Sequence, residues 1–300
     1  MKNIGHNKPP LSSREIIEKN IERKRPILDR EPQFYDNVPL PSWIELSLID
    51  VCNRKCNFCP KSDDSIAPDT FNKMEIALVK KLIKDLDKIN FKGAFSISGY
   101  GEPLLHNDLI NIIKLLSANW AVEIVTNGDP LNEKNLKDLH GTNLSKIVVS
   151  LYDGKHQKLK FNNMINNLNI SEDFLIMRER WIKGEEFDIY KTNRAGTLKN
   201  NGQFNLDKHI KNKCFYTAYH AQIDWNGDLY LCPHDWQRRV SMGNVMQKDF
   251  FEIWSSGNYN NYRKNLFQGN RNLSPCNNCD AIGTVHGKIH SEKWNKIFDK

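Results

Sequence analysis

The hydrophobic pattern between residues 43 and 151 predicts strands and helices that alternate along the chain. Short apolar segments predict strands, and apolar positions spaced three or four residues apart predict helices. The first helix is expected to begin at Asn72, with Glu75 completing a capping box. Strands are expected at 43–49, 93–98, 121–126 and 146–151, helices at 72–86, 108–117 and 132–139, and weaker strands at 174–177 and 187–190. The alternation predicts a parallel sheet with right-handed crossovers.

The predicted strands have one apolar and one polar face. In the first strand Ile44, Leu46 and Leu48 alternate with Glu45 and Ser47, and the second strand alternates in the same way. A flat sheet covered by helices on both sides would favour continuous apolar runs. The polar face therefore indicates a curved sheet, a full or partial barrel, with a site at the carboxyl ends of its strands.

The regions before and after this pattern differ from it. Residues 1–40 predict a helical arm, with its helix at 13–24, followed by a linker that contains prolines. Residues 41–205 form the predicted α/β core. Residues 206–300 are rich in Cys, Asn, Gly and Trp and have few periodic segments, so this small domain is expected to need a metal or disulfide staple.

Composition describes an ordinary globular protein. Of the 300 residues 39% are hydrophobic, and no apolar run approaches the roughly 18 residues of a membrane helix. The N-terminus lacks the apolar core of a secretory signal, so a cytoplasmic location is expected, without a membrane partner. The net charge of +7 comes from scattered lysines, and the one basic cluster, Arg23 to Arg25, lies beside acidic residues. Nucleic-acid binding is disfavoured, whereas anionic small molecules remain candidates.

Seven cysteines are the chemically informative residues. In a cytoplasmic protein disulfides are unexpected, and metal ligation or catalysis is considered first. Three of them, Cys52, Cys56 and Cys59, follow the first strand with C-x3-C-x2-C spacing. This triplet could be a buried helical stripe or part of a zinc site, but a structural zinc ion requires four ligands. A [4Fe–4S] cluster held by three thiolates would instead keep one iron open for another ligand.

The C-x3-C-x2-C loop, with the aromatic Phe58 directly before the last cysteine, resembles the fingerprint of the radical S-adenosylmethionine (SAM) superfamily. The resemblance implies a partial (β/α)6 TIM-like barrel. It also implies that Cys52, Cys56 and Cys59 hold a catalytic [4Fe–4S] cluster whose open iron binds the amino and carboxylate groups of SAM.

Other motifs fall where this family binds SAM. Gly101 and Glu102 match the Gly-Glu-Pro part of its second-strand motif, and Tyr100 replaces the preceding glycine. The resemblance implies that the acid binds the ammonium of SAM. Asn127 and Ser150, at the ends of the next two strands, and the more weakly indicated Arg194 are further candidates for SAM contact, although strand ends and turns also carry such residues for structural reasons.

The C-terminal cysteines resemble a shortened, twitch-like SPASM extension. Twelve residues separate Cys214 from Gly227, four more precede Cys232, and Cys276 and Cys279 form a C-x2-C pair. The resemblance implies one auxiliary [4Fe–4S] cluster with four protein ligands, although zinc fits the spacing equally well. His220 and His234 are nearby candidates for an additional ligand.

The resemblance implies that a flavodoxin- or ferredoxin-type donor reduces the first cluster. SAM then yields a 5′-deoxyadenosyl radical, which takes hydrogen from a substrate. Three plus four ligands use all seven cysteines, so no thiol remains to return a hydrogen atom as epimerases require. Oxidation by a dehydrogenase is therefore favoured, unless Tyr152, Tyr219 or another group donates hydrogen.

The substrate class is less constrained. The 40-residue arm is too short for the N-terminal peptide-binding domain of many peptide maturases, which favours a small molecule such as a sugar or aminocyclitol. A peptide-modifying maturase, a sugar epimerase and a non-catalytic iron–sulfur electron carrier are the alternatives. An open iron argues against the last of these, because an electron carrier gains nothing from it.

Overall fold

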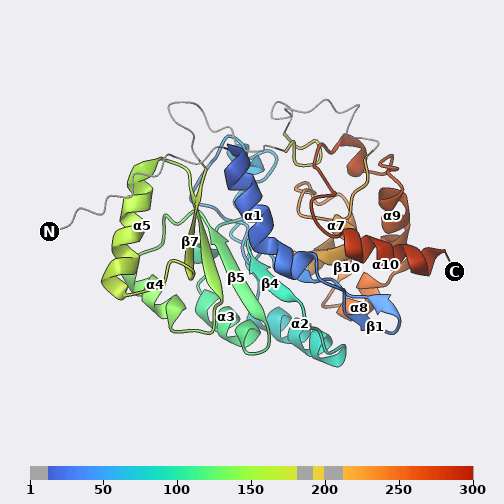
Figure 1. Cartoon of the computed structure of the whole chain (residues 1–300), viewed down its shortest axis with the longest axis horizontal. Coiled ribbons are helices and arrows are strands. Elements are labelled where there is room, and N and C mark those ends of the chain that lie inside the picture. The colour runs from blue at the N-terminus through green and yellow to red at the C-terminus, as the bar shows by residue number, and fades with distance from the viewer. Residues whose placement is uncertain (1–12, 181–191, 199–211, 300) are drawn as a thin grey trace.

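The structure, a computed structural model, describes residues 13–180, 192–198 and 212–299 and is built around one open sheet (Figure 1). The sheet has eight strands in the order β10-β9-β8-β3-β4-β5-β6-β7, of which β8 through β7 are parallel and β9 and β10 antiparallel. The strands are β3 (Trp43–Leu46), β4 (Ala94–Ile97), β5 (Ala121–Thr126), β6 (Lys146–Leu151), β7 (Leu175–Glu179), β8 (His220–Ile223), β9 (Asp228–Tyr230) and β10 (Ser241–Asn244). The expected α/β architecture of a partial barrel is confirmed, and the sheet does not close into a full barrel.

Helices that follow the strands cover the apolar face of this sheet. Ile44, Phe95 and Val122 lie side by side on neighbouring strands and are fully buried. The helices are α2 (Ile76–Lys88), α3 (Leu109–Ser117), α4 (Glu133–His140) and α5 (Lys155–Leu168), each connecting one strand to the next. Their apolar stripes and the strands form one core, as the sequence periodicity predicts.

The predicted capping box at Asn72 is wrong. Helix α2 begins at Ile76, and Glu75 is its N-cap residue but accepts no side-chain hydrogen bond there. The main-chain amide of Asn72 instead donates to Oδ1 of Asp50 at 3.1 Å, which ties this segment to the loop after β3. A capping box does occur at α4, where Asn132 and Asn135 exchange hydrogen bonds.

The sixth parallel strand comes from the C-terminal region. Strand β8 pairs with β3, so that Trp43 lies opposite His220 and Glu45 opposite Gln222. Its four residues, His-Ala-Gln-Ile, are too few and too polar to give a strand signal, which is why the pattern showed no strand there. The sheet thus crosses the predicted boundary at residue 205. The strand expected at 187–190 lies outside the described residues.

The arm adds a helix on the polar face of the sheet. Helix α1 (Ser13–Leu28) extends four residues beyond the expected end, and Figure 1 shows it running along the sheet between β5 and the C-terminal helices. Arg23 forms an ion pair with the buried Glu123 of β5, and the ammonium of Lys24 lies 4.9 Å from the ring centroid of Trp43. A two-stranded sheet, β1 (Phe34–Tyr35) with β2 (Val38–Pro39), follows the helix.

The C-terminal region packs against the same core. Its helices are α7 (Tyr216–Tyr219), α8 (Phe250–Trp254), α9 (Gly257–Phe267) and α10 (Lys288–Phe298). At its centre the guanidinium of Arg263 lies within 4.2 Å of the ring centroids of Trp254, Tyr259 and Trp294. None of the helices in the described ranges is long and apolar enough to cross a membrane.

Candidate active site and auxiliary metal centre

The three-cysteine loop lies at the carboxyl end of β3. It is an irregular loop rather than a helix, which excludes the interpretation of a helical cysteine stripe. The amide of Cys59 donates to the carbonyl of Cys56 at 2.9 Å, and the amide of Cys52 donates to Oδ1 of Asp69 at 3.2 Å. None of the three forms a disulfide, and burial raises the pKa of Cys56 to about 11.

An arginine within the loop anchors it to two neighbouring strands. Nη2 of Arg54 donates to Asp129 at 2.6 Å and Nη1 donates to Asp153 at 2.9 Å, so two carboxylates from the loops after β5 and β6 hold one guanidinium. Its charge also lies 5.5 Å from the ring centroid of Tyr152, which contacts Phe58 at 5.3 Å. The hydrogen bonds that Arg54 donates to Asp153 and Asp129 raise the pKa of its guanidinium. The loop is therefore fixed in relation to the strand ends.

The Gly-Glu-Pro turn packs directly beneath the cysteine loop. A Cβ atom on Gly101 would lie 2.2 Å from the carbonyl oxygen of Ile49, so only glycine allows this close approach. Glu102 is 2% exposed, and its carboxylate accepts hydrogen bonds from the Thr126 hydroxyl at 2.6 Å and from the amides of Asn127 and Leu104 at 2.9 and 3.1 Å. Burial is the largest influence and raises its pKa. Glu102 thus joins the ends of β4 and β5.

Asn127 and Ser150 lie at the ends of the next two strands, as the sequence pattern predicts. The side-chain amide of Asn127 donates to Asn53 at 2.8 Å and lies 3.9 Å from the sulfur of Cys52. Ser150 is 1% exposed and accepts a hydrogen bond from Nη2 of Arg178, directly opposite on β7, at 2.7 Å. Burial lowers the pKa of Arg178 to about 9. Arg178 was not singled out from the sequence, because an arginine at a strand end gives no distinctive signal.

Tyr100, at the motif position where the family has glycine, connects this turn with the C-terminal region. Its ring packs edge-on against Trp236 with centroids 4.9 Å apart, and its hydroxyl donates to the carbonyl of Asp235 at 3.3 Å. The guanidinium of Arg238 lies over the same ring, 4.6 Å from its centroid. Tyr100 and Trp236 belong to a buried cluster against which Cys59 also packs. The two cysteine regions are therefore in contact through aromatic side chains.

Arg194 lies between the two regions. It adopts a left-handed backbone conformation with φ of 50°, and its guanidinium lies 5.9 Å from the ring centroid of Trp236. Its buried Nε has no hydrogen-bond partner among the described residues. The preceding Asn193 fixes this turn, because its amide donates to Asp280 at 2.8 Å and its side chain donates to the carbonyl of Asn278 at 2.8 Å.

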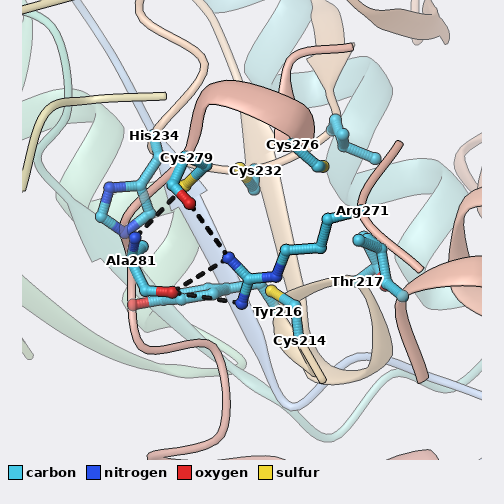
Figure 2. Close-up of a pocket in the computed structure, with 11 residues that line it drawn as sticks. Cys214, Tyr216, Thr217, Cys232, His234, Arg271, Cys276, Cys279 and Ala281 are labelled. Carbon is cyan, nitrogen blue, oxygen red and sulfur yellow. Dashed lines mark hydrogen bonds between the residues drawn. The ribbon is translucent and has the colours of Figure 1, made fainter. Parts of the chain in front are cut away.

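The four C-terminal cysteines line a single pocket, shown in Figure 2. Cys214, Cys232, Cys276 and Cys279 come from segments up to 65 residues apart, and none is in a disulfide. Burial raises the pKa of all four thiols, that of Cys279 to about 11. Four buried or half-buried thiols around one pocket fit a thiolate-ligated metal, which would replace their protons.

The two histidines proposed as extra ligands lie in different places. His234 lines the pocket beside the cysteines, and burial lowers its pKa to about 3, so its imidazole is neutral. His220 lies on β8, and its Nε2 is 3.4 Å from a carboxylate oxygen of Glu45. Only His234 is therefore placed near the four-cysteine pocket.

Arg271 also lines this pocket and was not singled out from the sequence. It is 1% exposed and lies between the cysteines in Figure 2, where its guanidinium bonds the carbonyls of Cys279 and Ala281. A lone arginine between two cysteine motifs is usually a solvated surface residue, and only its burial distinguishes this one.

A three-cysteine loop at the carboxyl edge of an open parallel sheet, with a four-thiol pocket beside it, defines an iron–sulfur enzyme with two metal centres. The sequence profile of the radical SAM superfamily matches residues 46–175, and that of the SPASM iron–sulfur cluster-binding domain matches residues 214–280. The chain belongs to the radical SAM superfamily and carries a C-terminal SPASM domain. The SPASM match favours iron–sulfur over zinc at the four-cysteine pocket. The cofactors of the chain are therefore SAM and iron–sulfur clusters at two sites.

One curated relative and two solved structures are similar to this chain over most of its length. The chain is 29% identical over 245 residues to the SAM-dependent 2-deoxy-scyllo-inosamine dehydrogenase of Niallia circulans, covering 80% of this chain and 93% of the relative. The crystal structure of BtrN with AdoMet and 2-DOIA superposes with a TM-score of 0.71 at 28% identity, covering 84% of this chain and 98% of that one. Streptococcus suis SuiB bound to its precursor peptide SuiA, at 16% identity and a TM-score of 0.52 with 81% and 68% covered, shares the fold.

Proposed function

We propose that the protein is a radical SAM dehydrogenase that oxidises a carbon bearing a hydroxyl group in a small cyclic polyol of the aminocyclitol class. One observation carries the proposal: the chain resembles a 2-deoxy-scyllo-inosamine dehydrogenase over 93% of that enzyme's length. Both cysteine sites also lie inside the matched family profiles, because residues 46–175 include Cys52, Cys56 and Cys59 and residues 214–280 include the other four cysteines.

We assign the residues of the first site as follows. Cys52, Cys56 and Cys59 hold the cluster with the open iron, and Phe58 packs beside it. Gly101, Glu102, Asn127, Ser150 and Arg194 form the SAM-binding wall. The carboxylate of Glu102 accepts three hydrogen bonds from the protein and has about four acceptor positions, which leaves one for the ammonium of SAM. When bound, SAM and the cluster supply the radical that removes a hydrogen atom from the substrate.

The second site accounts for the remaining electron. Oxidation of a secondary alcohol to a ketone releases one hydrogen atom, one proton and one electron. Cys214, Cys232, Cys276 and Cys279 occupy every iron of a cubane, so this cluster binds no substrate and is suited to accept that electron. The contact of Tyr100 with Trp236 keeps the two sites in one packed unit.

The number of thiols supports oxidation over epimerisation. All seven cysteines of the chain belong to the two groups, three in the loop and four at the pocket. An epimerase needs a hydrogen-atom donor, and this assignment leaves no cysteine for that role. The electron that starts each turnover comes from a flavodoxin- or ferredoxin-type donor in this proposal.

The experiment is an anaerobic assay of the protein with reconstituted clusters, SAM and dithionite. A panel of aminocyclitols, including 2-deoxy-scyllo-inosamine, and of neutral cyclitols and sugars is offered. The expected result is 5′-deoxyadenosine and a ketone product in equal amounts. An isomer of the substrate that gains one deuterium when the reaction runs in heavy water would show epimerisation, and the absence of 5′-deoxyadenosine with every substrate would overturn the proposal.

A further inference from the structure

Arg271 is a buried cation whose hydrogen bonds all go to uncharged groups. Its side chain is 1% exposed, and its nitrogens donate to the main-chain carbonyls of Asn212, Lys213, Cys279 and Ala281 at 2.8 to 3.3 Å. In the part of the chain that the structure describes, no carboxylate lies within 4.0 Å of these nitrogens. The carbonyls satisfy its donors but leave its positive charge without an anion.

A buried charge of this kind is unfavourable unless an opposite charge lies near it. The four thiols become anionic when they bind a metal, and Arg271 lines their pocket together with them. Burial raises the pKa of the thiols of Cys214, Cys276 and Cys279, whereas the positive charge of Arg271 lowers it. Four thiolates around a [4Fe–4S]2+ core have a net charge of 2−, and reduction by one electron makes it 3−.

We infer that Arg271 sets the reduction potential of the auxiliary cluster, because its buried guanidinium stabilises the more negative, reduced state. Net charge and hydrogen bonding around the sulfurs are the levers by which proteins tune such clusters. The inference rests on the proposed function, in which this cluster accepts an electron from the substrate. A higher potential would make that transfer more favourable.

The test is a redox titration of the auxiliary cluster, followed by electron paramagnetic resonance. The full chain with Cys52, Cys56 and Cys59 replaced by alanine is reconstituted anaerobically, so that only the auxiliary cluster contributes, and neither SAM nor substrate is added. Arg271→Gln is expected to lower the equilibrium constant for reduction of the cluster at least tenfold. For one electron, this is a shift of the potential by at least 59 mV to more negative values. Arg271→Lys keeps the charge and is expected to shift this equilibrium constant less than tenfold.

Two control variants, Arg263→Gln and Arg271→Lys, distinguish an effect of the charge on the potential from an effect of impaired folding. Arg263 is also fully buried, but aromatic rings enclose its guanidinium, so Arg263→Gln is expected to lower stability and shift the potential less than Arg271→Gln. An equal shift in that variant, or an unchanged potential in Arg271→Gln, would overturn the inference. If Arg271→Gln does not load a cluster, Arg271→Lys decides: a reduction equilibrium constant lowered tenfold despite the retained charge would also overturn the inference. Since no substrate is used, this outcome is independent of the dehydrogenase assay.

Discussion

Tyr100 of the SAM-motif turn packs edge-on against Trp236 of the SPASM region, with ring centroids 4.9 Å apart. Their contact joins a turn that follows β4 to a loop four residues after Cys232, and the Tyr100 hydroxyl adds a hydrogen bond of 3.3 Å to Asp235. Both rings are buried. The residue that departs from the family's glycine is thus the one that connects the two cysteine sites.

Tyr100→Gly restores the family's residue and tests this connection. Loss of a buried aromatic side chain is expected to lower the free energy of unfolding by about 3–5 kcal/mol. Tyr100→Phe keeps the ring and removes only the hydroxyl, so a loss of about 1 kcal/mol is expected. Urea unfolding measures both. Tyr100→Gly should also raise the ratio of 5′-deoxyadenosine to oxidised product, and an unaltered ratio would show that the contact is structural only.

The docking of α1 depends on Arg23. This residue neutralises the buried Glu123, so Arg23→Ala leaves an unpaired carboxylate and is expected to cost about 3 kcal/mol of stability. Arg25 lies on the exposed side of the same helix, and Arg25→Ala should change stability by less than about 0.5 kcal/mol. Urea unfolding with hydrogen exchange along α1 measures the difference. Adding Glu123→Gln to Arg23→Ala should recover part of the loss, and no recovery would rule out the ion pair as its cause.

Cys56→Ala and Cys276→Ala are expected to have different effects on SAM cleavage. In the proposed assignment Cys56 is a ligand of the cluster that binds SAM, so Cys56→Ala should abolish 5′-deoxyadenosine formation. Cys276 is a proposed ligand at the other site, so Cys276→Ala should lower stability and product formation while some SAM cleavage remains. Quantified iron, 5′-deoxyadenosine and product in each variant separate the two sites. Full SAM cleavage by Cys56→Ala would contradict the ligand assignment.

Glu102→Gln tests the acid of the Gly-Glu-Pro turn. The amide keeps the volume and one acceptor oxygen but places an NH2 group opposite either the Thr126 hydroxyl or the Asn127 amide. Weaker SAM binding by about tenfold is expected, because a charge-assisted hydrogen bond to the ammonium is lost. Equilibrium binding of SAM to the reconstituted protein measures this effect. Identical dissociation constants for the two proteins would remove Glu102 from the SAM-binding wall.

Much of the core could be predicted from the sequence because its signals are local. Strands β5 and β6 begin and end where the sequence pattern predicts. Cys52, Cys56 and Cys59 lie within one segment of eight residues, so their grouping needs no tertiary information. The predicted start of α2 was wrong because Asn72 donates a hydrogen bond to Asp50, which lies 22 residues earlier, instead of capping the helix.

What only the tertiary structure decided involves residues far apart in the chain. Strand β8 is too short and polar to be predicted alone and is stabilised by pairing with β3, some 175 residues earlier. Arg271 carries no sequence signal because its importance comes from burial beside four thiols. The sequence determined where the cysteine motifs and the Gly-Glu-Pro turn lie in the chain, since a motif is a property of residue type and spacing. Their electrostatic surroundings depend on long-range packing, and therefore only the folded chain defines them.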